Sequence, residues 1–300
     1  MALRISVGLY GVQQLYGDQA RSLVDVAVQV DEAGLDQINL VDHVVMGERT
    51  DRYPYGPFPA QSGYPWYEPM VAMSAIAGAT RRLRVSTGIL ITPLRSAVLL
   101  AKQAATLDAI SGGRLDLGVG TGWQREEYEA SGVPFLGRMQ RMEDQLRACR
   151  ALWSDSPASF RSPTVSFERI WSDPKPVQQP VPLWFGIAVN EVAARRVAEL
   201  GVGWLPISNR CKDIAPGVAL LRRAFEQAGR DPRALRVRAQ PETRMDGAGR
   251  PDLEKTIAGI GQSLEAGVSD LEFSLFQFVR SRDELADFLA RLVRLKQSGQ

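Results

Sequence analysis

Apolar and polar positions along the chain follow two periods, one typical of strands and one typical of helices. Between Leu83 and Trp123, the β-branched apolar run LRVSTGILI is followed by a long segment with apolar residues at helical spacing. After Gly112 and Gly113, a second apolar run, RLDLGVGTGW, ends in glycines. The pattern predicts a strand, a crossover helix and a second strand that lies parallel to the first.

The same alternation continues on both sides of this unit. Further strands are expected at residues 4–10, 36–42, 181–186, 202–206, 235–242 and 269–276. Helices are expected at residues 20–34, 67–80, 137–153, 190–201 and 252–267, with one more ending at Arg230 and a last one beginning at Asp283. Eight strand–helix pairs predict an α/β fold, a (β/α)8 TIM barrel that spans residues 1–300 as one domain. We expect strands that are apolar on both faces, as in parallel sheets buried between helices.

Two segments, residues 44–66 and 154–180, fall outside the alternation and are rich in Pro, Gly and aromatic residues. Both are longer than ordinary barrel loops. The first is an insertion after the second strand, so we expect it at the catalytic face, where the carboxyl ends of barrel strands lie. The second is an insertion before the fifth strand; it begins on the opposite face, where a strand or hairpin could form.

Charge and composition exclude several partners. The 300 residues carry 36 basic and 34 acidic side chains, so no global field favours nucleic acid or an anionic membrane. Pairs of arginines are scattered, and we expect them on the solvated surface: Arg81, Arg82, Arg84, Arg222, Arg223, Arg236 and Arg238. Cys149 and Cys211 lack metal-ligand spacing and predict no disulfide framework. With no signal-like or membrane-spanning run, the chain is expected to be cytoplasmic.

His43 is the single histidine of the chain and follows directly on the second expected strand, in NLVDHV. A residue at this position reaches the mouth of a barrel, where histidine can exchange a proton near neutral pH or hydrogen-bond a bound ring. The alternative is a loop histidine held by a backbone carbonyl. A lone histidine also argues against a multi-histidine metal site, and we predict no metal. Asp42 could accept a hydrogen bond from a cofactor N–H or cap the loop through an Asx turn.

Glycines at the end of the run LGVGTGW let a ligand approach the backbone, which makes residues 118–122 a candidate cofactor site. Thr121 offers a hydroxyl, and Trp123 either floors a pocket or packs under the loop. Glu126 and Glu127 follow; one of them could be an acid or base, or form a salt bridge to Arg138 or Arg141.

A third candidate is the stretch GIAVNEVAARRVAELG, in which a strand ends at Gly186 and a helix begins near Asn190. Free backbone amides and the positive end of a helix dipole together favour an anion. We therefore expect an anion site at Gly186, Ile187, Ala188 and Val189.

Taken together, these motifs resemble one known family. VDH after the second strand, the segment TGILITPLRSAVLLAKQAATLDAISGGRLDLGVGTGW, and the stretches EYEASGVPFLGR, DPKPVQQPVPLWFG and VAARRVAELGVGW carry the resemblance. The chain resembles the luciferase-like monooxygenase superfamily, and within it the coenzyme F420-dependent oxidoreductases. The resemblance implies a (β/α)8 barrel that binds a flavin or deazaflavin at the carboxyl-end mouth, and it admits a homodimer because relatives often dimerise.

By motif position, the resemblance also implies residue roles. The cofactor ring would meet Asp42 and His43 and pack against a bulge at Gly88 and Ile89, where relatives have a non-proline cis peptide bond. We therefore predict a cis bond between Gly88 and Ile89. Further cofactor contacts are expected at Thr92 near the ring, at Gly120, Thr121 and Gly122 along the tail, and at residues 186–189 around the phosphate.

The activity that the resemblance implies is hydride transfer between coenzyme F420 and a small organic substrate, with His43 handling the proton. Where deazaflavin relatives can carry a glutamate after these glycines, this chain has Trp123, and its nearest carboxylates are Glu126 and Glu127. An aromatic loop would cover an apolar or aromatic substrate, or would pack without touching a ligand: Tyr53, Tyr55, Phe58, Tyr64, Trp66 and Tyr67. Tyr10, Tyr64, Trp66 and Trp123 are the expected substrate pocket. The alternatives are an FMN-dependent monooxygenase fed by a separate reductase, and a barrel that binds the cofactor without chemistry.

Overall fold

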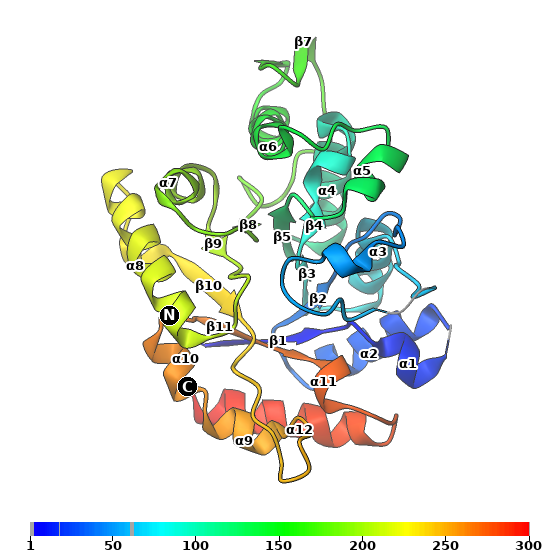
Figure 1. Cartoon of the computed structure of the whole chain (residues 1–300). Coiled ribbons are helices and arrows are strands. Elements are labelled where there is room, and N and C mark those ends of the chain that lie inside the picture. Colours follow the sequence, from blue (N-terminus) through cyan, green and yellow to red (C-terminus); the bar gives the residue numbers. More distant parts are fainter. Residues whose placement is uncertain (1–2, 18, 61–62, 300) are drawn as a thin grey trace.

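A closed parallel barrel forms the centre of the computed structural model, which describes residues 3–17, 19–60 and 63–299 (Figure 1). Within these residues, strands are hydrogen-bonded in the order β3–β2–β1–β11–β10–β9–β8–β5–β4, and β3 also pairs with β5, which closes the ring. β3 and β4 are consecutive halves of one position in the barrel, so the ring has eight positions. The predicted (β/α)8 fold is confirmed.

The barrel strands are short, and each barrel pairing is parallel. They are β1 (Arg4–Gly8), β2 (Gln37–Leu40), β3 (Arg84–Thr87), β4 (Leu90–Ile91), β5 (Leu115–Gly120), β8 (Leu183–Phe185), β9 (Gly203–Trp204), β10 (Arg236–Ala239) and β11 (Asp270–Ser274). Around them lie α2 (Arg21–Glu32), α3 (Pro69–Ala79), α4 (Ala97–Ser111), α6 (Arg138–Ser154), α7 (Glu191–Leu200), α8 (Cys211–Gln227) and α12 (Glu284–Ser298).

The ends of α4 show how the sequence sets an element locally. The Ser96 hydroxyl accepts a hydrogen bond from the Leu99 amide at 3.3 Å, which satisfies one of the free donors at the helix start. Gly112 and Gly113 then have φ of +66° and +82°, the left-handed region that favours glycine. The Gly-Gly stop therefore ends the helix and turns the chain into β5.

Several elements differ from the sequence-based expectation. The strand expected at residues 83–91 is two strands, β3 and β4, and the Gly88–Ile89 peptide bond between them is cis, as predicted. The helix expected at residues 252–267 is two short helices, α9 (Leu253–Ala258) and α10 (Gly261–Glu265). Three short helices after barrel strands were not predicted: α1 (Val12–Tyr16), α5 (Arg125–Ala130) and α11 (Leu275–Phe278). The second insertion contains an antiparallel hairpin of β6 (Ala158–Arg161) and β7 (Ser166–Ile170).

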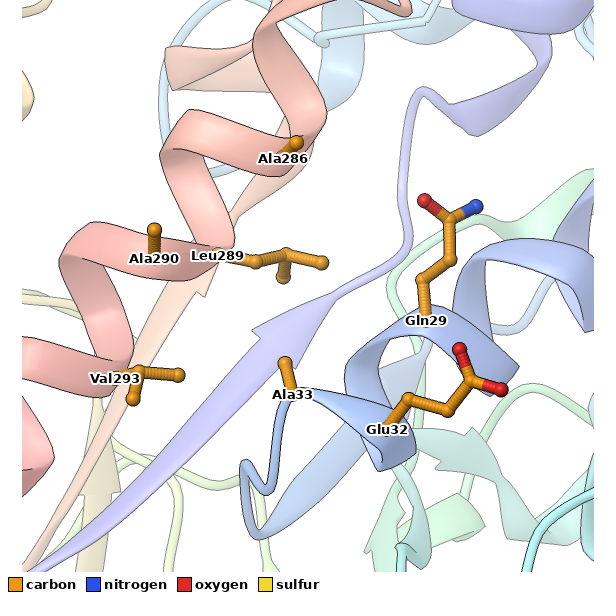
Figure 2. A pocket seen from close by; sticks show the side chains of 7 residues that line it. All are labelled: Gln29, Glu32, Ala33, Ala286, Leu289, Ala290 and Val293. Atoms are coloured by element: carbon orange, nitrogen blue, oxygen red, sulfur yellow. The ribbon is translucent and has the colours of Figure 1, made fainter.

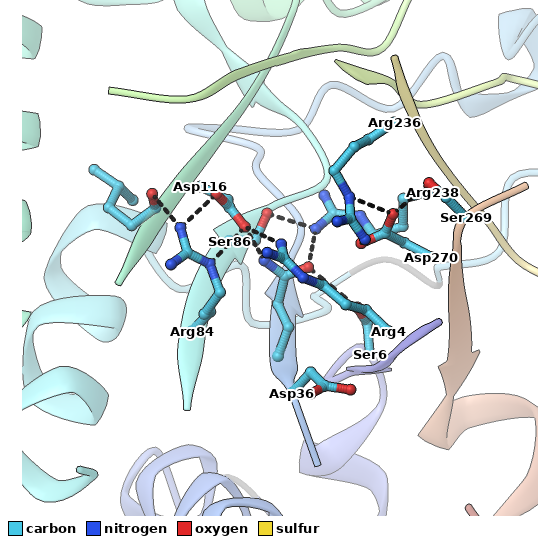
Figure 3. A network of polar contacts seen from close by, with 12 residues as sticks. Arg4, Ser6, Asp36, Arg84, Ser86, Asp116, Arg236, Arg238, Ser269 and Asp270 are labelled. Atoms are coloured by element: carbon cyan, nitrogen blue, oxygen red, sulfur yellow. Dashed lines mark hydrogen bonds and ion pairs between the residues drawn. The ribbon is translucent and has the colours of Figure 1, made fainter. Parts of the chain in front are cut away.

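The interior of the barrel corrects a prediction, because it is largely polar rather than apolar. Alternate residues of β1, β3, β5, β10 and β11 carry charged or hydroxyl side chains that meet across the ring (Figure 3). Arg84 donates to Asp116 at 2.7 and 2.9 Å, and Arg236 donates to Asp270 at 2.8 and 2.9 Å. Such a core is tolerated because each charge has an opposite partner.

Three of the arginines expected on the surface therefore lie inside. Arg238 is 2% exposed and donates to Ser86 Oγ at 2.8 Å, while Arg84 and Arg236 are partly buried in their pairs with aspartate. The strand period of two explains the error, because it places every second residue inside the ring. The other four arginines are exposed, as expected: Arg81, Arg82, Arg222 and Arg223. Among the described residues, no helix combines the length and hydropathy needed to span a membrane.

Candidate active site

His43 lies just beyond β2 and is held by a buried carboxylate. Its ring nitrogen Nδ1 is 3.0 Å from Glu127 Oε2, and the other carboxylate oxygen of Glu127 accepts from the Val44 amide at 2.6 Å. Glu127 is fully buried in α5, and His43 is 9% exposed. Because a carboxylate is an acceptor, Nδ1 is the protonated nitrogen in this pair. Nε2 makes no hydrogen bond within the described part of the chain, so it is available to a bound molecule.

The two neighbouring glutamates have separate roles. Glu127, expected to be an acid, a base or a partner of Arg138 or Arg141, contacts His43 from the first turn of α5, and its role as an acid or base stays a prediction. Glu126 pairs with Arg52 of the loop after β2, at 3.5 Å and close to solvent. The salt bridges to Arg138 and Arg141 were therefore wrong, since the loop after β2 packs over α5 and supplies both partners.

Asp42 orders the strand ends around the site. Its oxygens accept from both guanidinium NH2 groups of Arg95, at 2.7 and 3.0 Å, and from the Ile91 amide at 2.8 Å. Burial opposes the charge of Arg95, but hydrogen bonds to Asp42 and Glu68 outweigh it and raise the Arg95 pKa. The Asx turn expected of Asp42 is not formed, because the Val44 amide donates to Glu127 and Arg95, 53 residues away, holds the Asp42 carboxylate. The expected contact of Asp42 with the cofactor stays a prediction.

Aromatic rings from the loop after β2 and from the segment after β5 surround His43. The His43 ring centroid lies 4.7 Å from Trp66, 5.9 Å from Phe58 and 6.4 Å from Trp123, all edge to face. Trp66 in turn contacts Tyr64 and Tyr10, whose rings stack on each other at 4.9 Å. The predicted pocket residues therefore form one cluster at the carboxyl-end mouth, with Tyr53 packed on Trp123 at 5.2 Å. Residues 61 and 62 of this loop lie outside the described residues.

Two polar atoms in this cluster are buried without a partner among the described residues. They are the Tyr10 hydroxyl and the Trp123 indole Nε1. Burial raises the pKa of Tyr10, so its hydroxyl stays protonated and can donate. Buried donors without a partner are costly, and a site that binds a ligand with acceptor atoms explains two of them together.

The glycines at the strand ends first make room for Ile89, the residue after the cis bond. A Cβ at Gly186 would lie 2.3 Å from Ile89 Cγ2, and one at Gly120 would lie 2.8 Å from Ile89 Cδ1. At Gly118 a Cβ would lie 1.9 Å from the Thr87 carbonyl oxygen. Ile89 is therefore seated between the end of β5 and the residue after β8, and it remains half-buried at the mouth. The expected ligand contacts of these glycines stay a prediction.

This seating gives a testable expectation. Gly186→Ala should lower the free energy of unfolding by about 1–3 kcal/mol, because the branched side chain of Ile89 cannot swing away from the new methyl group. Urea unfolding followed by circular dichroism measures it. Gly78→Ala is the matched control, since nothing lies within 4 Å of that position in α3, and it should be neutral or stabilising. Adding Ile89→Ala to Gly186→Ala should recover part of the loss; no recovery would contradict the seating.

The remaining predicted cofactor contacts are placed as follows. Thr121 and Gly122 are half-buried beyond β5, and Gly186 and Val189 are half-buried before α7, next to exposed Ala188 and buried Ile187. The Ile187 carbonyl accepts from the Trp204 indole at 2.9 Å, which fixes this stretch. Thr92 is fully buried and its hydroxyl donates to the Leu90 carbonyl at 3.4 Å. Thr92 therefore holds the turn after β4, and its expected place near the ring stays a prediction.

Other parts of the described chain offer less. Among the described residues, no cluster of three or more His, Cys, Asp or Glu side chains could hold a metal ion. A hollow of about 460 Å³ lies between α2 and α12. Figure 2 shows the side chains that line it. It is lined by Gln29, Glu32, Ala33, Ala286, Leu289, Ala290 and Val293, none of which was predicted as a site residue. These residues lie on the outer helices rather than at strand ends, so the mouth around His43 is the candidate site.

Comparison with known protein families shows to which family the chain belongs. A family model described as luciferase-like monooxygenase matches residues 5–245. The chain belongs to the luciferase-like monooxygenase family. Its relatives include an uncharacterized protein of Mycobacterium tuberculosis (strain ATCC 25618 / H37Rv), 32% identical over 227 residues, which are 75% of this chain and 74% of the relative.

Two further relatives carry names that differ in cofactor. An F420-dependent glucose-6-phosphate dehydrogenase of Amycolatopsis mediterranei (strain U-32) is 28% identical, over 69% of this chain and 58% of its own length. An FMNH2-dependent dimethylsulfone monooxygenase of Pseudomonas putida is 36% identical, over 46% of this chain and 38% of its own length. The family therefore contains members that use either cofactor.

Solved structures share the fold. An F420-dependent secondary alcohol dehydrogenase, in complex with an F420–acetone adduct, superposes with a TM-score of 0.77 at 17% identity, covering 99% of each chain. The long-chain alkane monooxygenase LadA has a TM-score of 0.77 at 13% identity, covering 99% of this chain and 92% of its own. At these identities the likeness concerns the barrel and not the substrate.

Proposed function

We propose that this family member is a coenzyme F420-dependent oxidoreductase that transfers hydride between the deazaflavin and a small apolar or aromatic substrate. The observation that carries the proposal is the His43–Glu127 pair at the barrel mouth, with Nδ1 held at 3.0 Å and Nε2 left for chemistry. Hydride transfer to or from a carbonyl or alcohol needs one proton moved in parallel, and an oriented imidazole can move it.

The residues at the mouth fit a flat heterocyclic ring. Half-buried Ile89 offers an apolar surface, and the Tyr10 hydroxyl and Trp123 indole are buried donors without partners among the described residues. Flavins and deazaflavins have carbonyl and nitrogen acceptors on the ring, and these acceptors could receive the hydrogen bonds of the Tyr10 and Trp123 donors. Residues 120–122 and 186–189 are the proposed contacts of the tail and phosphate. When bound, the cofactor donates or accepts the hydride, and the protein supplies position and electrostatics.

The aromatic cluster has a proposed role in excluding water. Trp66 and Phe58 pack edge to face on the His43 ring, and Trp123, in the loop after β5, contacts the same ring. A dry surrounding strengthens electrostatic interactions at the reacting atoms and keeps solvent from competing for the proton at Nε2. It also favours substrates with an apolar or aromatic body.

Cofactor titration tests the proposal directly. We expect coenzyme F420 to bind at least about tenfold more tightly than FMN, which is roughly 1.4 kcal/mol. Intrinsic fluorescence quenching reports binding through Trp66 and Trp123, which lie at the mouth. Reduced F420 should then be oxidised by a ketone or a reducible aromatic compound of a substrate panel, or oxidised F420 should be reduced by an alcohol of the same panel.

The FMN-dependent monooxygenase is the second candidate, supported by the 36% identity to the dimethylsulfone enzyme. FMN binding at least tenfold tighter than F420, with oxygen-dependent turnover of reduced FMN, would replace our proposal with this one. Tight binding of F420 without redox activity on the panel would instead favour a barrel that only binds the cofactor.

A further inference from the structure

One side of the mouth is built from polar groups that the proposed chemistry does not use. Gln240 Nε2 donates to Glu272 Oε1 at 3.3 Å, Gln277 Nε2 donates to Gln240 Oε1 at 3.3 Å, and the Thr243 hydroxyl donates to Gln277 Oε1 at 3.4 Å. We call these four residues the polar wall. They lie on β11 or follow the ends of β10 and β11, so the wall rises at the carboxyl-end face of the barrel.

The carboxylate of Glu272 reaches the top of the barrel. A Cβ built at Gly8 would lie 3.2 Å from Glu272 Oε1 and 3.5 Å from the Ser274 Cα. Gly8 and Ser274 form the last register pair of β1 and β11. The Glu272 side chain is 12% exposed, in contrast to the fully buried Asp270 two residues earlier, which belongs to the interior network.

The Glu272 carboxylate has acceptor positions to spare, and a neighbouring arginine balances its charge. Within the described residues its hydrogen bond comes from Gln240, and a carboxylate has about four acceptor positions. Arg238 Nε lies 3.7 Å from Glu272 Oε2, beyond hydrogen-bond distance, and its side chain is 1% exposed. Because this guanidinium already balances the carboxylate charge, the site favours a neutral O–H or N–H donor over a cation.

The polar wall and the aromatic cluster are neighbours, because adjacent residues of α11 belong to each of them. Phe276 of α11 packs edge to face on Tyr10 at 5.2 Å, and the next residue, Gln277, belongs to the wall. Tyr10 continues to Trp66, which contacts His43. A molecule at the mouth therefore has rings on one side and carboxylate and amide oxygens on the other.

We infer that Glu272 is a specificity-determining residue that accepts a hydrogen bond from a neutral O–H or N–H of the substrate, whose apolar or aromatic body lies against the rings. The inference rests on the proposed function, because it assigns the substrate of the same site. It narrows the substrate class from apolar molecules in general to those with a hydrogen-bond donor at one end.

Two probes that differ in one donor test it. The purified full chain is titrated by calorimetry with 4-methylphenol and with 4-methylanisole, in which a methyl group replaces the hydroxyl hydrogen. We expect 4-methylphenol to bind at least about tenfold more tightly, as for a hydrogen bond to a charged acceptor. Glu272→Gln should reduce that preference to about threefold or less. Glu265→Gln makes the same change on an exposed glutamate of α10 and should leave the preference intact.

Each outcome decides the inference. Equal binding of the two probes to the unmodified chain, or an unchanged preference in Glu272→Gln, overturns it. If Glu272→Gln unfolds, Glu272→Asp is the second variant. It keeps the charge beside Arg238, but its shorter side chain moves the carboxylate away from Gly8, and it should lower the preference for 4-methylphenol. An F420 titration of the same preparations separates the two proposals: a donor preference without F420 binding refutes the proposed function alone, and F420 binding without the preference refutes the inference alone.

Discussion

Replacing His43 by alanine should lower kcat by about a hundredfold or more, while the Kd of the cofactor changes by less than about threefold. General acid or base catalysis by one positioned side chain typically contributes at least that factor. The fold should survive, because the ring lies at the mouth and packs on neighbouring rings rather than in the main core. The measurements are turnover on a substrate found in the panel and a cofactor titration. A normal kcat with a raised KM would make His43 a substrate-binding residue instead.

The role of Glu127 can be separated from that of His43, because it acts through the imidazole. Glu127→Gln should lower kcat by about tenfold or more and change the tautomer, since an amide can donate to Nδ1 whereas a carboxylate only accepts. His43 is the single histidine of the chain, so its two ring nitrogens are the imidazole signals in ¹⁵N NMR, and their couplings to the ring protons report the tautomer. Glu126→Gln, next in sequence and paired with Arg52 near solvent, is the matched control and should change neither kcat nor the signals. An unaltered tautomer in Glu127→Gln would contradict the positioning role.

Most of the fold could be predicted from the hydrophobic periodicity of the sequence. Long helices such as α4 and α6 have the apolar spacing and end signals that make elements readable, and the strand–helix order then leaves few topologies. The polar interior was misread although a signal existed: RISVG, RVRA and DLEFS alternate strictly, with the polar residue of each pair facing inward. Parallel strands buried between helices are usually apolar on both faces, and that expectation outweighed the pattern.

The sequence predicted which strand ends carry the candidate site, but it did not predict the hydrogen-bond partners of the residues there. His43 could be placed because it follows a strand directly, and the cis bond because the resemblance implied it. Glu127 could not be paired with His43 from sequence, since α5 has six residues and too few turns for a periodicity. Contacts across 53 or 84 positions, such as Asp42 with Arg95 and His43 with Glu127, depend on loop conformations that no local pattern encodes.

The interior network makes a strong prediction about stability. Asp116→Asn should lower the free energy of unfolding by about 3–5 kcal/mol at neutral pH, because it leaves the partly buried guanidinium of Arg84 without its counter-charge. Asp116 is 2% exposed and accepts from Arg84 at 2.7 and 2.9 Å and from Gln37 Nε2 at 2.6 Å. Urea unfolding at pH 7 measures the change. Asp25→Asn is the control, since its pair with Arg21 is exposed, and it should cost less than about 0.5 kcal/mol.

The pH dependence gives this prediction its sign. Burial raises the pKa of Asp116, but hydrogen bonds and charges from Arg84, with Arg238 and Arg4, outweigh it and hold the pKa below its usual value. The unfolded chain, with a pKa near 3.9, therefore binds a proton more readily than the folded one, so the contribution of Asp116 is complete above about pH 5. It disappears as pH falls through the lower folded pKa. The stability difference between the unmodified chain and Asp116→Asn should accordingly shrink below pH 4, because both then carry a neutral group beside Arg84; a difference that stays constant down to pH 2 would refute this account.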